Sequence, residues 1–380
     1  ATAVSLAGCG NSSTNTNASA SAASTASTAS GAASASTTAA AAPLSPAALS
    51  NVYPFGANTF LGSEVDITKR ERTVQMMKAA HIGWMKEQFL WDQIEHVRGT
   101  FTWDKYDEIV GLAEKYGIKV IARLDYPPPW TQKKPNFNAP PDNMPDYADF
   151  VNTFVKHYKG RVAAVQIWNE PNLAVEWGGS PPDAVAYTKL LKLAYGRAKE
   201  ADPNVTVLSA PLAETLERSP RALVETEFLQ MMYDAGAKGS FDVLSANAYG
   251  LAYPPDDAPR VDRLNFQRFT FLHDVVVKNG EPDKPVWFNE YGWNASPADF
   301  PPDQLIWGRV TRAQQAQYTV DGIKLAKSKY PYVGVVNIWY FRQVGSIPKT
   351  DSSYYFDMVD PEFNEEPVYG AIRDAAAQWK

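Results

Sequence analysis

Two glutamates in this chain of 380 residues each follow an asparagine directly after a run of strand-forming residues. Glu170 lies in the segment QIWNEPN and Glu290 in VWFNEYGWN. Two carboxyl groups that face each other across a cleft can cleave a glycosidic bond, because one gives a proton to the leaving oxygen while the other attacks the anomeric carbon. For Glu170, a surface ion pair or a cap on the following helix is the structural alternative.

The pattern of apolar residues predicts the elements that must position these carboxyl groups. Eight runs rich in β-branched and aromatic residues predict strands at 54–60, 82–89, 118–124, 163–169, 205–211, 241–247, 285–290 and 333–340. Amphipathic segments between them, such as 106–116 before Gly117 and 187–198 after Asp183, predict helices. Eight strand–helix units favour a (β/α)8 TIM barrel, one folded domain over residues 51–380, rather than an open doubly wound sheet.

In such a barrel, catalytic residues lie at the C-terminal ends of the strands. Glu170 ends the fourth predicted strand and Glu290 the seventh, so the two can face each other across the barrel mouth. A gap of roughly 5 to 5.5 Å between the carboxyl groups would give retention through a covalent intermediate. Apolar neighbours such as Trp168, together with the negative charge of Glu290, are expected to keep Glu170 protonated.

Composition excludes several classes of protein. The formal net charge of −6 and the lack of a Lys/Arg cluster argue against nucleic acid as a partner. The one cysteine, Cys9, allows no intramolecular disulfide and no thiolate metal cage, and the four histidines are scattered without the spacing of metal ligands. No run of about 18 apolar residues predicts a membrane-spanning helix.

The first fifty residues differ from the rest of the chain. Leu6-Ala7-Gly8-Cys9 resembles the lipobox of bacterial lipoproteins, in which the signal peptide is cut before a cysteine that is then acylated; a chance match in an Ala-rich tail is the alternative. Residues 1–10 are therefore read as a signal remnant, and residues 11–50, rich in Ser, Thr and Ala, as a disordered linker. The chain is expected to be extracellular or anchored at the cell surface through Cys9.

WNEPN at the fourth strand and NEYGW at the seventh together resemble clan A of the glycoside hydrolases, a group of retaining (β/α)8 glycosidases. Within the clan, the chain is most similar to family thirty-nine and its relatives, which include β-xylosidases, α-L-iduronidases and exopolysaccharide hydrolases. The similarity covers residues 52–380 and includes FLWDQIEHVRGTFTWDKYDEIVGLAEKYGIKVIARLDYPPPW, SANAYG and NIWYF. N-E-P alone would be a weak signal, but the combination is specific.

The resemblance implies a role for each matching residue. Glu170 would be the general acid/base and Glu290 the nucleophile. Asn169 would hydrogen-bond the sugar hydroxyl next to the anomeric carbon, and Tyr249 would support the nucleophile. Trp339 would form the floor under the sugar, whose C–H face packs well on an aromatic ring.

Five further positions are candidates for substrate binding. Trp91, Trp130 and Trp177 are candidates for walls or additional subsites, with core packing as the alternative for each. Lys86 stands where many clan members carry arginine, and Asn247 where relatives often carry histidine. Both departures lie near the sugar-binding subsite, so they place the identity of the sugar in doubt more than the reaction.

These observations predict a retaining O-glycosyl hydrolase that acts on an extracellular poly- or oligosaccharide by double displacement. The mechanism requires no metal, nucleotide or organic cofactor. Two alternatives stay open. A transglycosylase would use the same residues with a sugar as acceptor, and a carbohydrate-binding surface lipoprotein would keep the aromatic site without turnover.

Overall fold

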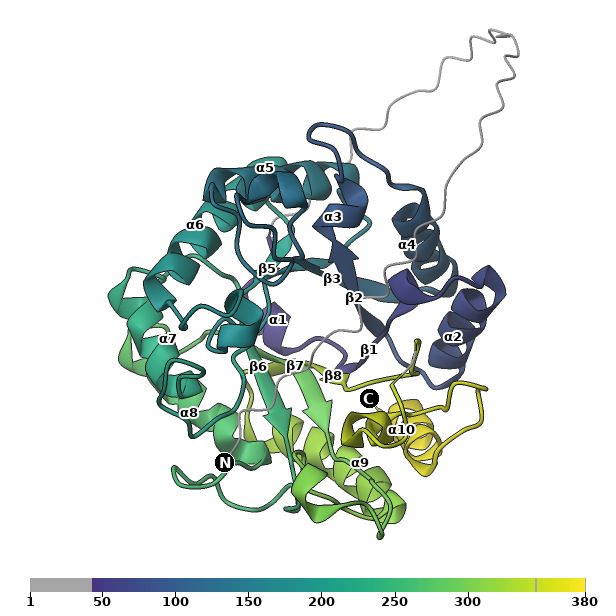
Figure 1. The fold of residues 1–380 in the computed structure, drawn as a ribbon. Coiled ribbons are helices and arrows are strands. Elements are labelled where there is room, and N and C mark those ends of the chain that lie inside the picture. Colours follow the sequence, from purple (N-terminus) through teal and green to yellow (C-terminus); the bar gives the residue numbers. More distant parts are fainter. Residues whose placement is uncertain (1–42, 346, 380) are drawn as a thin grey trace, which may run out of the picture.

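The computed structural model describes residues 43–345 and 347–379, and the predicted lipobox with Cys9 lies outside this part of the chain. Eight parallel strands form a ring with helices around it (Figure 1). The strands are β1 (Phe55–Asn58), β2 (Trp84–Leu90), β3 (Lys119–Asp125), β4 (Ala164–Ile167), β5 (Thr206–Leu208), β6 (Leu244–Tyr249), β7 (Val286–Gly292) and β8 (Val333–Ile338). Each predicted strand is present, and the predicted TIM barrel is confirmed.

The strand order in the sheet is β5-β4-β3-β2-β1-β8-β7-β6, with parallel pairing between neighbours. An isolated parallel bridge between Leu208 and Val243 joins β5 to β6, and it brings the ring close to closure. The C-terminal ends of all eight strands therefore meet at one mouth, where the predicted site residues lie.

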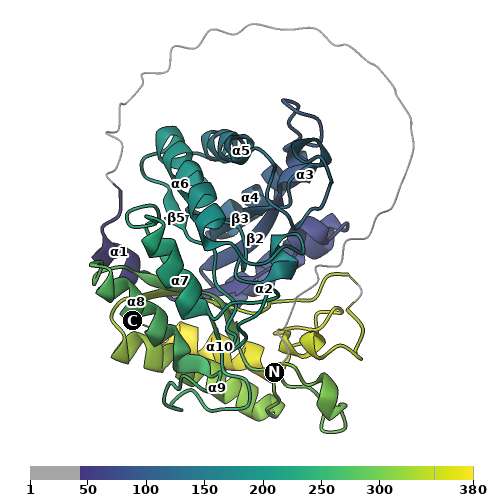
Figure 2. The same cartoon turned by 60° about the vertical axis from the view of Figure 1, so that its left-hand side comes forward.

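The helices surround the ring, except α1, which lies across one end of it (Figure 1). They are α1 (Pro46–Ser50), α2 (Ile67–Ala79), α3 (Trp91–Ile94), α4 (Asp104–Tyr116), α5 (Met144–His157), α6 (Ala184–Ala201), α7 (Glu225–Asp234), α8 (Phe269–Lys278), α9 (Arg312–Lys329) and α10 (Pro367–Ala377). As expected, α4 ends at Gly117 with a left-handed φ of 68°, and the Asp183 side chain accepts a hydrogen bond from the first turn of α6. The last helix, α10, packs beside α9 (Figure 2). No helix within the described ranges has both the length and the apolarity needed to cross a bilayer.

The short helix α1 falls inside the range predicted as linker, so the packed chain begins earlier than residue 51. Leu49 is buried and belongs to an apolar cluster with Trp84 and Trp287 inside the barrel. The backbone carbonyl of Leu49 also accepts a hydrogen bond of 2.9 Å from the Trp287 indole. Because Trp287 lies at the start of β7, α1 closes the end of the barrel opposite the mouth.

Candidate active site

The backbone around Glu170 is irregular. Strand β4 ends at Ile167, and both Trp168 and Glu170 then take positive φ values, 72° and 35°. Such conformations cost about 1–3 kcal/mol each for residues other than glycine, and they persist where the surroundings hold them in place. Here the Trp168 indole donates to the Glu176 carbonyl at 2.9 Å, and the Glu170 N–H donates to the Pro211 carbonyl at 3.1 Å. These bonds fix the direction of the Glu170 carboxyl.

A bulge in β7 positions Glu290. Phe288 pairs with Ala246 of β6, but Glu290 pairs with the next residue, Asn247, which leaves Asn289 as an extra residue in β7. Phe288 and Tyr291 both pack toward the helices, although regular alternation would put residues three apart on opposite faces. The bulge thus turns Glu290 to the inner face of the barrel.

Side chains from four strands meet around the two carboxyl groups. The Asn247 amide of β6 donates to Glu170 Oε1 at 2.6 Å. The Tyr249 hydroxyl of β6 donates to Glu290 Oε2 at 2.8 Å, and Lys86 Nζ of β2 lies 3.6 Å from Glu290 Oε1. All five side chains are buried. The sequence prediction that these residues share one site therefore holds in the geometry.

The two carboxyl groups face different partners. Burial raises the pKa of Glu170 well above its usual value, and the charges of Glu290 and Glu176 raise it further. Glu290 instead faces a cation and a hydroxyl donor. Burial lowers the pKa of Lys86 to about 8, although the nearby Glu290 charge opposes this shift. The surroundings thus favour the protonated form of Glu170, whereas Glu290 lies beside a cation and a hydroxyl donor.

A third carboxyl group, Glu176, belongs to the site but was not predicted from sequence. It lies on the 3-10 turn Ala174–Trp177, and burial raises its pKa to about 7, opposed mainly by the positive charge of Arg123. Arg123 Nε lies 2.5 Å from Asp125 Oδ2 on β3, and Gln88 donates to the other oxygen of Asp125 at 2.8 Å. A signal existed in the sequence for its neighbours: Arg123 and Asp125 are charged residues on one face of β3, near the strand end that forms the mouth.

Aromatic side chains line the other side of the mouth. Trp339 directly follows β8 and is 7% exposed. It belongs to a cluster that we call the mouth aromatic cluster, formed by Tyr249, Trp307, Trp339, Tyr340 and Phe356, with Phe60 packed against it. The structure thus brings Trp339 and Tyr249 together, as the floor prediction requires. Trp307 is a member that was not predicted.

Two of the three other tryptophans predicted as walls pack against the helix layer. Trp91 is 0% exposed and stacks on Phe150 of α5, so the prediction that it lines a sugar site is wrong. The same holds for Trp177, which is 4% exposed and packs edge-on against Trp168. Trp130 is partly exposed, and its indole donates to the Glu95 carbonyl at 3.0 Å. Trp91 and Trp177 fill space between the barrel and its helices, which residue type alone does not reveal, and the wall role of Trp130 stays a prediction.

Several buried polar atoms at the mouth have no hydrogen-bond partner among residues 43–345 and 347–379. They include Asn169 Oδ1, both polar atoms of the Asn289 amide, and Trp339 Nε1. Buried polar groups in folded proteins are nearly always paired, so a cluster of unpaired ones is unusual. A ligand with many hydroxyl groups, such as a sugar, can satisfy donors and acceptors of both kinds.

Comparison with known proteins finds similarity to glycoside hydrolases. The family described as glycosyl hydrolase family 10 matches residues 58–210, a segment that includes Glu170 and ends before Glu290. No curated protein is significantly similar to the chain. A family 39 glycoside hydrolase from Bacteroides cellulosilyticus WH2 superposes with a TM-score of 0.66 at 20% identity, over 86% of this chain and 64% of that one.

The predicted resemblance to clan A glycoside hydrolases is confirmed. Xylanase 10B of Thermotoga petrophila RKU-1, solved with xylobiose, also superposes on this chain. The TM-score is 0.59 at 16% identity, over 88% of this chain and 98% of the xylanase. Exo-β-1,4-mannosidase Op5Man5 of Opitutaceae bacterium strain TAV5 gives 0.59 at 14% identity, over 86% of this chain and 59% of that one. At these identities the structures establish the shared barrel. The family 10 match over residues 58–210, together with this barrel, supports a glycosidase.

Proposed function

We propose that the chain is a retaining glycosidase of an extracellular poly- or oligosaccharide, with Glu170 as general acid/base and Glu290 as nucleophile. The observation that carries this proposal is the contrast between the two buried carboxyl groups. Glu170 has a raised pKa, whereas Glu290 accepts from Tyr249 and faces Lys86. This pairing of a proton donor with a charged carboxylate is what double displacement needs.

The proposed reaction has two steps. In the first, a carboxylate oxygen of Glu290 bonds to the anomeric carbon as the glycosidic C–O bond breaks, and the proton of Glu170 passes to the leaving oxygen. In the second, Glu170 takes a proton from water, whose oxygen attacks the anomeric carbon and releases Glu290. In this proposal Asn169, next to Glu170 in the chain, binds the neighbouring hydroxyl, and Trp339 supports the sugar face.

The names of the similar structures guide the choice of substrate. One is a xylanase solved with xylobiose and another is an exo-β-1,4-mannosidase. We therefore propose β-linked neutral sugars as the first class to test, with uronic acids and amino sugars as further arms. Transglycosylation uses the same residues, and an added acceptor sugar distinguishes it because the product is then a new glycoside rather than a free sugar.

The deciding experiment measures hydrolysis of 4-nitrophenyl glycosides and xylo-oligosaccharides by the wild type, Glu290→Ala and Glu170→Ala. Glu114→Ala is a matched control, since Glu114 pairs with Arg161 on the protein surface. We expect Glu290→Ala to be inactive, and azide to restore turnover of activated substrates by Glu170→Ala with a glycosyl azide as product. Saccharide binding without any wild-type turnover would instead support the carbohydrate-binding lipoprotein.

Surface anchoring is a separate proposal, supported by the motif Leu6-Ala7-Gly8-Cys9 alone. Metabolic labelling with a radioactive fatty acid tests it in a bacterial host. We expect label in the full chain and none in Cys9→Ala; equal labelling of both would contradict the anchor.

A further inference from the structure

Trp307 is a member of the mouth aromatic cluster to which neither the sequence nor the proposed mechanism assigns a role. It lies between β7 and α9, and its ring centroid is 4.7 Å from that of Tyr249 and 5.5 Å from that of Phe356. Tyr249 in turn donates to the predicted nucleophile Glu290. Trp307 is therefore one residue removed from the reacting carboxylate, in the same cluster as the predicted sugar floor Trp339.

The backbone that carries Trp307 is held closely against the segment that follows β6. Gly308 has a φ of 65°, and a Cβ at this position would lie 2.9 Å from Ala252 N and 3.0 Å from the carbonyl carbon of Leu251. Only glycine combines this φ with such a close approach. The position of the indole is thus set by packing of one loop on another.

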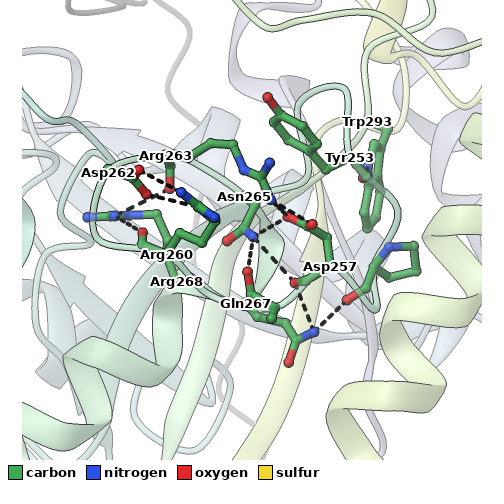
Figure 3. A network of polar contacts seen from close by, with 11 residues as sticks. Tyr253, Asp257, Arg260, Asp262, Arg263, Asn265, Gln267, Arg268 and Trp293 are labelled. Atoms are coloured by element: carbon green, nitrogen blue, oxygen red, sulfur yellow. Dashed lines mark hydrogen bonds and ion pairs between the residues drawn. The ribbon is translucent and has the colours of Figure 1, made fainter.

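The supporting segment is itself cross-linked by polar contacts (Figure 3). Asp257 accepts hydrogen bonds from Arg263 and from Asn265, and the Arg263 guanidinium lies 4.0 Å from the centre of the Tyr253 ring. The Tyr253 carbonyl accepts a hydrogen bond of 2.7 Å from Trp293, which directly follows β7. These contacts tie the loop after β6 to the end of β7, so Trp307 rests on a rigid support.

The indole N–H of Trp307 stands out within residues 43–345 and 347–379. The side chain is 8% exposed, and Nε1 is buried without a hydrogen-bond partner in the part of the chain that the structure describes. Other indoles find backbone or carboxyl acceptors, namely those of Trp84, Trp91, Trp130, Trp168, Trp287 and Trp293. The indole N–H of Trp339, the predicted floor under the sugar, is also buried without a hydrogen-bond partner among the described residues. An unpaired buried donor beside a sugar site marks a position for a ligand oxygen.

We propose that Trp307 determines specificity by donating its indole N–H to one hydroxyl group of the sugar that packs on Trp339. This inference rests on the proposed glycosidase function. A site built to pair with a hydroxyl discriminates against sugars that lack it, because the buried donor then stays unpaired. The alternative is a positioning role, in which Trp307 acts only by holding Tyr249 in place.

Deoxy substrates distinguish these two roles. The test measures kcat/KM of the wild type and Trp307→Phe on the 4-nitrophenyl glycoside that the wild type accepts, and on analogues that each lack one hydroxyl. We expect Trp307→Phe to lose about tenfold on the parent sugar and on most analogues. On one analogue the loss should vanish, because the hydroxyl that pairs with the indole is already absent.

Trp103→Phe is the matched control, since Trp103 precedes α4 and stacks on His157 of α5, in the helix layer around the barrel. Replacement of Trp307 by benzothienylalanine is a second variant that keeps the size of the ring and removes only the N–H. Equal losses on every analogue, or no loss with either variant, would overturn the proposal while wild-type turnover leaves the glycosidase function standing. Failure of the wild type on every glycoside would instead overturn the function on which the inference rests.

Discussion

Two neighbours act on the protonation of Glu170 in opposite directions, so their removal is predicted to shift the pH profile of activity in opposite directions. The Asn247 amide donates to Glu170 Oε1 at 2.6 Å and favours the charged form, whereas the negative charge of Glu176 disfavours it. Only protonated Glu170 can give a proton to the leaving oxygen. The fall of kcat/KM at high pH therefore reports the loss of this proton in the free enzyme.

The size of each effect follows from the contact that is removed. A hydrogen bond to a buried carboxylate contributes about 1.5 kcal/mol, and about 1.4 kcal/mol corresponds to one pH unit. In Asn247→Ala, the midpoint of the alkaline fall should therefore move up by about one unit. In Glu176→Gln it should move down, because Glu176, whose pKa is raised to about 7, is charged on that side of the profile in the wild type.

The assay is the pH dependence of kcat/KM on phenyl glycosides, whose poor leaving group needs the acid. Lys86, with a pKa lowered to about 8, also titrates in this range. The same profiles are therefore measured with 2,4-dinitrophenyl glycosides, whose leaving group, 2,4-dinitrophenolate, departs without a proton from the acid. The part of the alkaline fall that depends on the leaving group belongs to Glu170. Shifts of the same sign in both variants, or no shift in either, would refute the assignment of Glu170 as the acid.

Three further variants test the neighbours of the site and the base of the barrel. Tyr249→Phe removes the 2.8 Å hydrogen bond to Glu290, so we expect kcat to fall roughly 10- to 100-fold even on activated substrates; an unchanged kcat in stopped assays contradicts the role. Lys86→Met should lower kcat/KM and abolish the wild-type fall near pH 8 on activated substrates, and a fall that persists assigns it to another group. Leu49→Ala should lower the free energy of unfolding in urea by about 2–5 kcal/mol and leave KM unchanged, whereas unchanged stability would mean that α1 does not close the barrel.

The barrel could be predicted because its strands are marked by runs of β-branched and aromatic residues between turn residues. The ends of the strands were harder to predict. The fourth strand was predicted over 163–169, but β4 ends at Ile167 because Trp168 takes a left-handed conformation. Nothing in the residue type of tryptophan indicates a positive φ, since bulky residues seldom adopt one. The position of Glu170 was right, although the conformation that presents it was not foreseen.

The roles of the aromatic residues could not be read from the sequence. Trp91 directly follows β2 as the first residue of α3, and Trp307 lies in the loop between β7 and α9, yet Trp91 packs on α5 and Trp307 joins the mouth aromatic cluster. The difference depends on which loop folds over which strand, a long-range property that local pattern does not contain. Glu176 was missed for the same reason, because it reaches the site only through the 3-10 turn that follows Glu170.

Both catalytic candidates are presented by a break in the alternation of their strand. In β4, Ala164 points into the barrel, so regular alternation would bring Trp168 inward as well; it packs instead against Tyr147 of α5 and leaves the mouth to Glu170. In β7, the extra residue Asn289 moves Glu290 from the helix side to the inside. A regular parallel strand buries aliphatic side chains on both faces, so it offers little room for a carboxyl group that must meet a substrate. The irregular backbone therefore presents both candidate carboxyl groups: it anchors a large aromatic residue in the helix layer and leaves the next inner position to the glutamate.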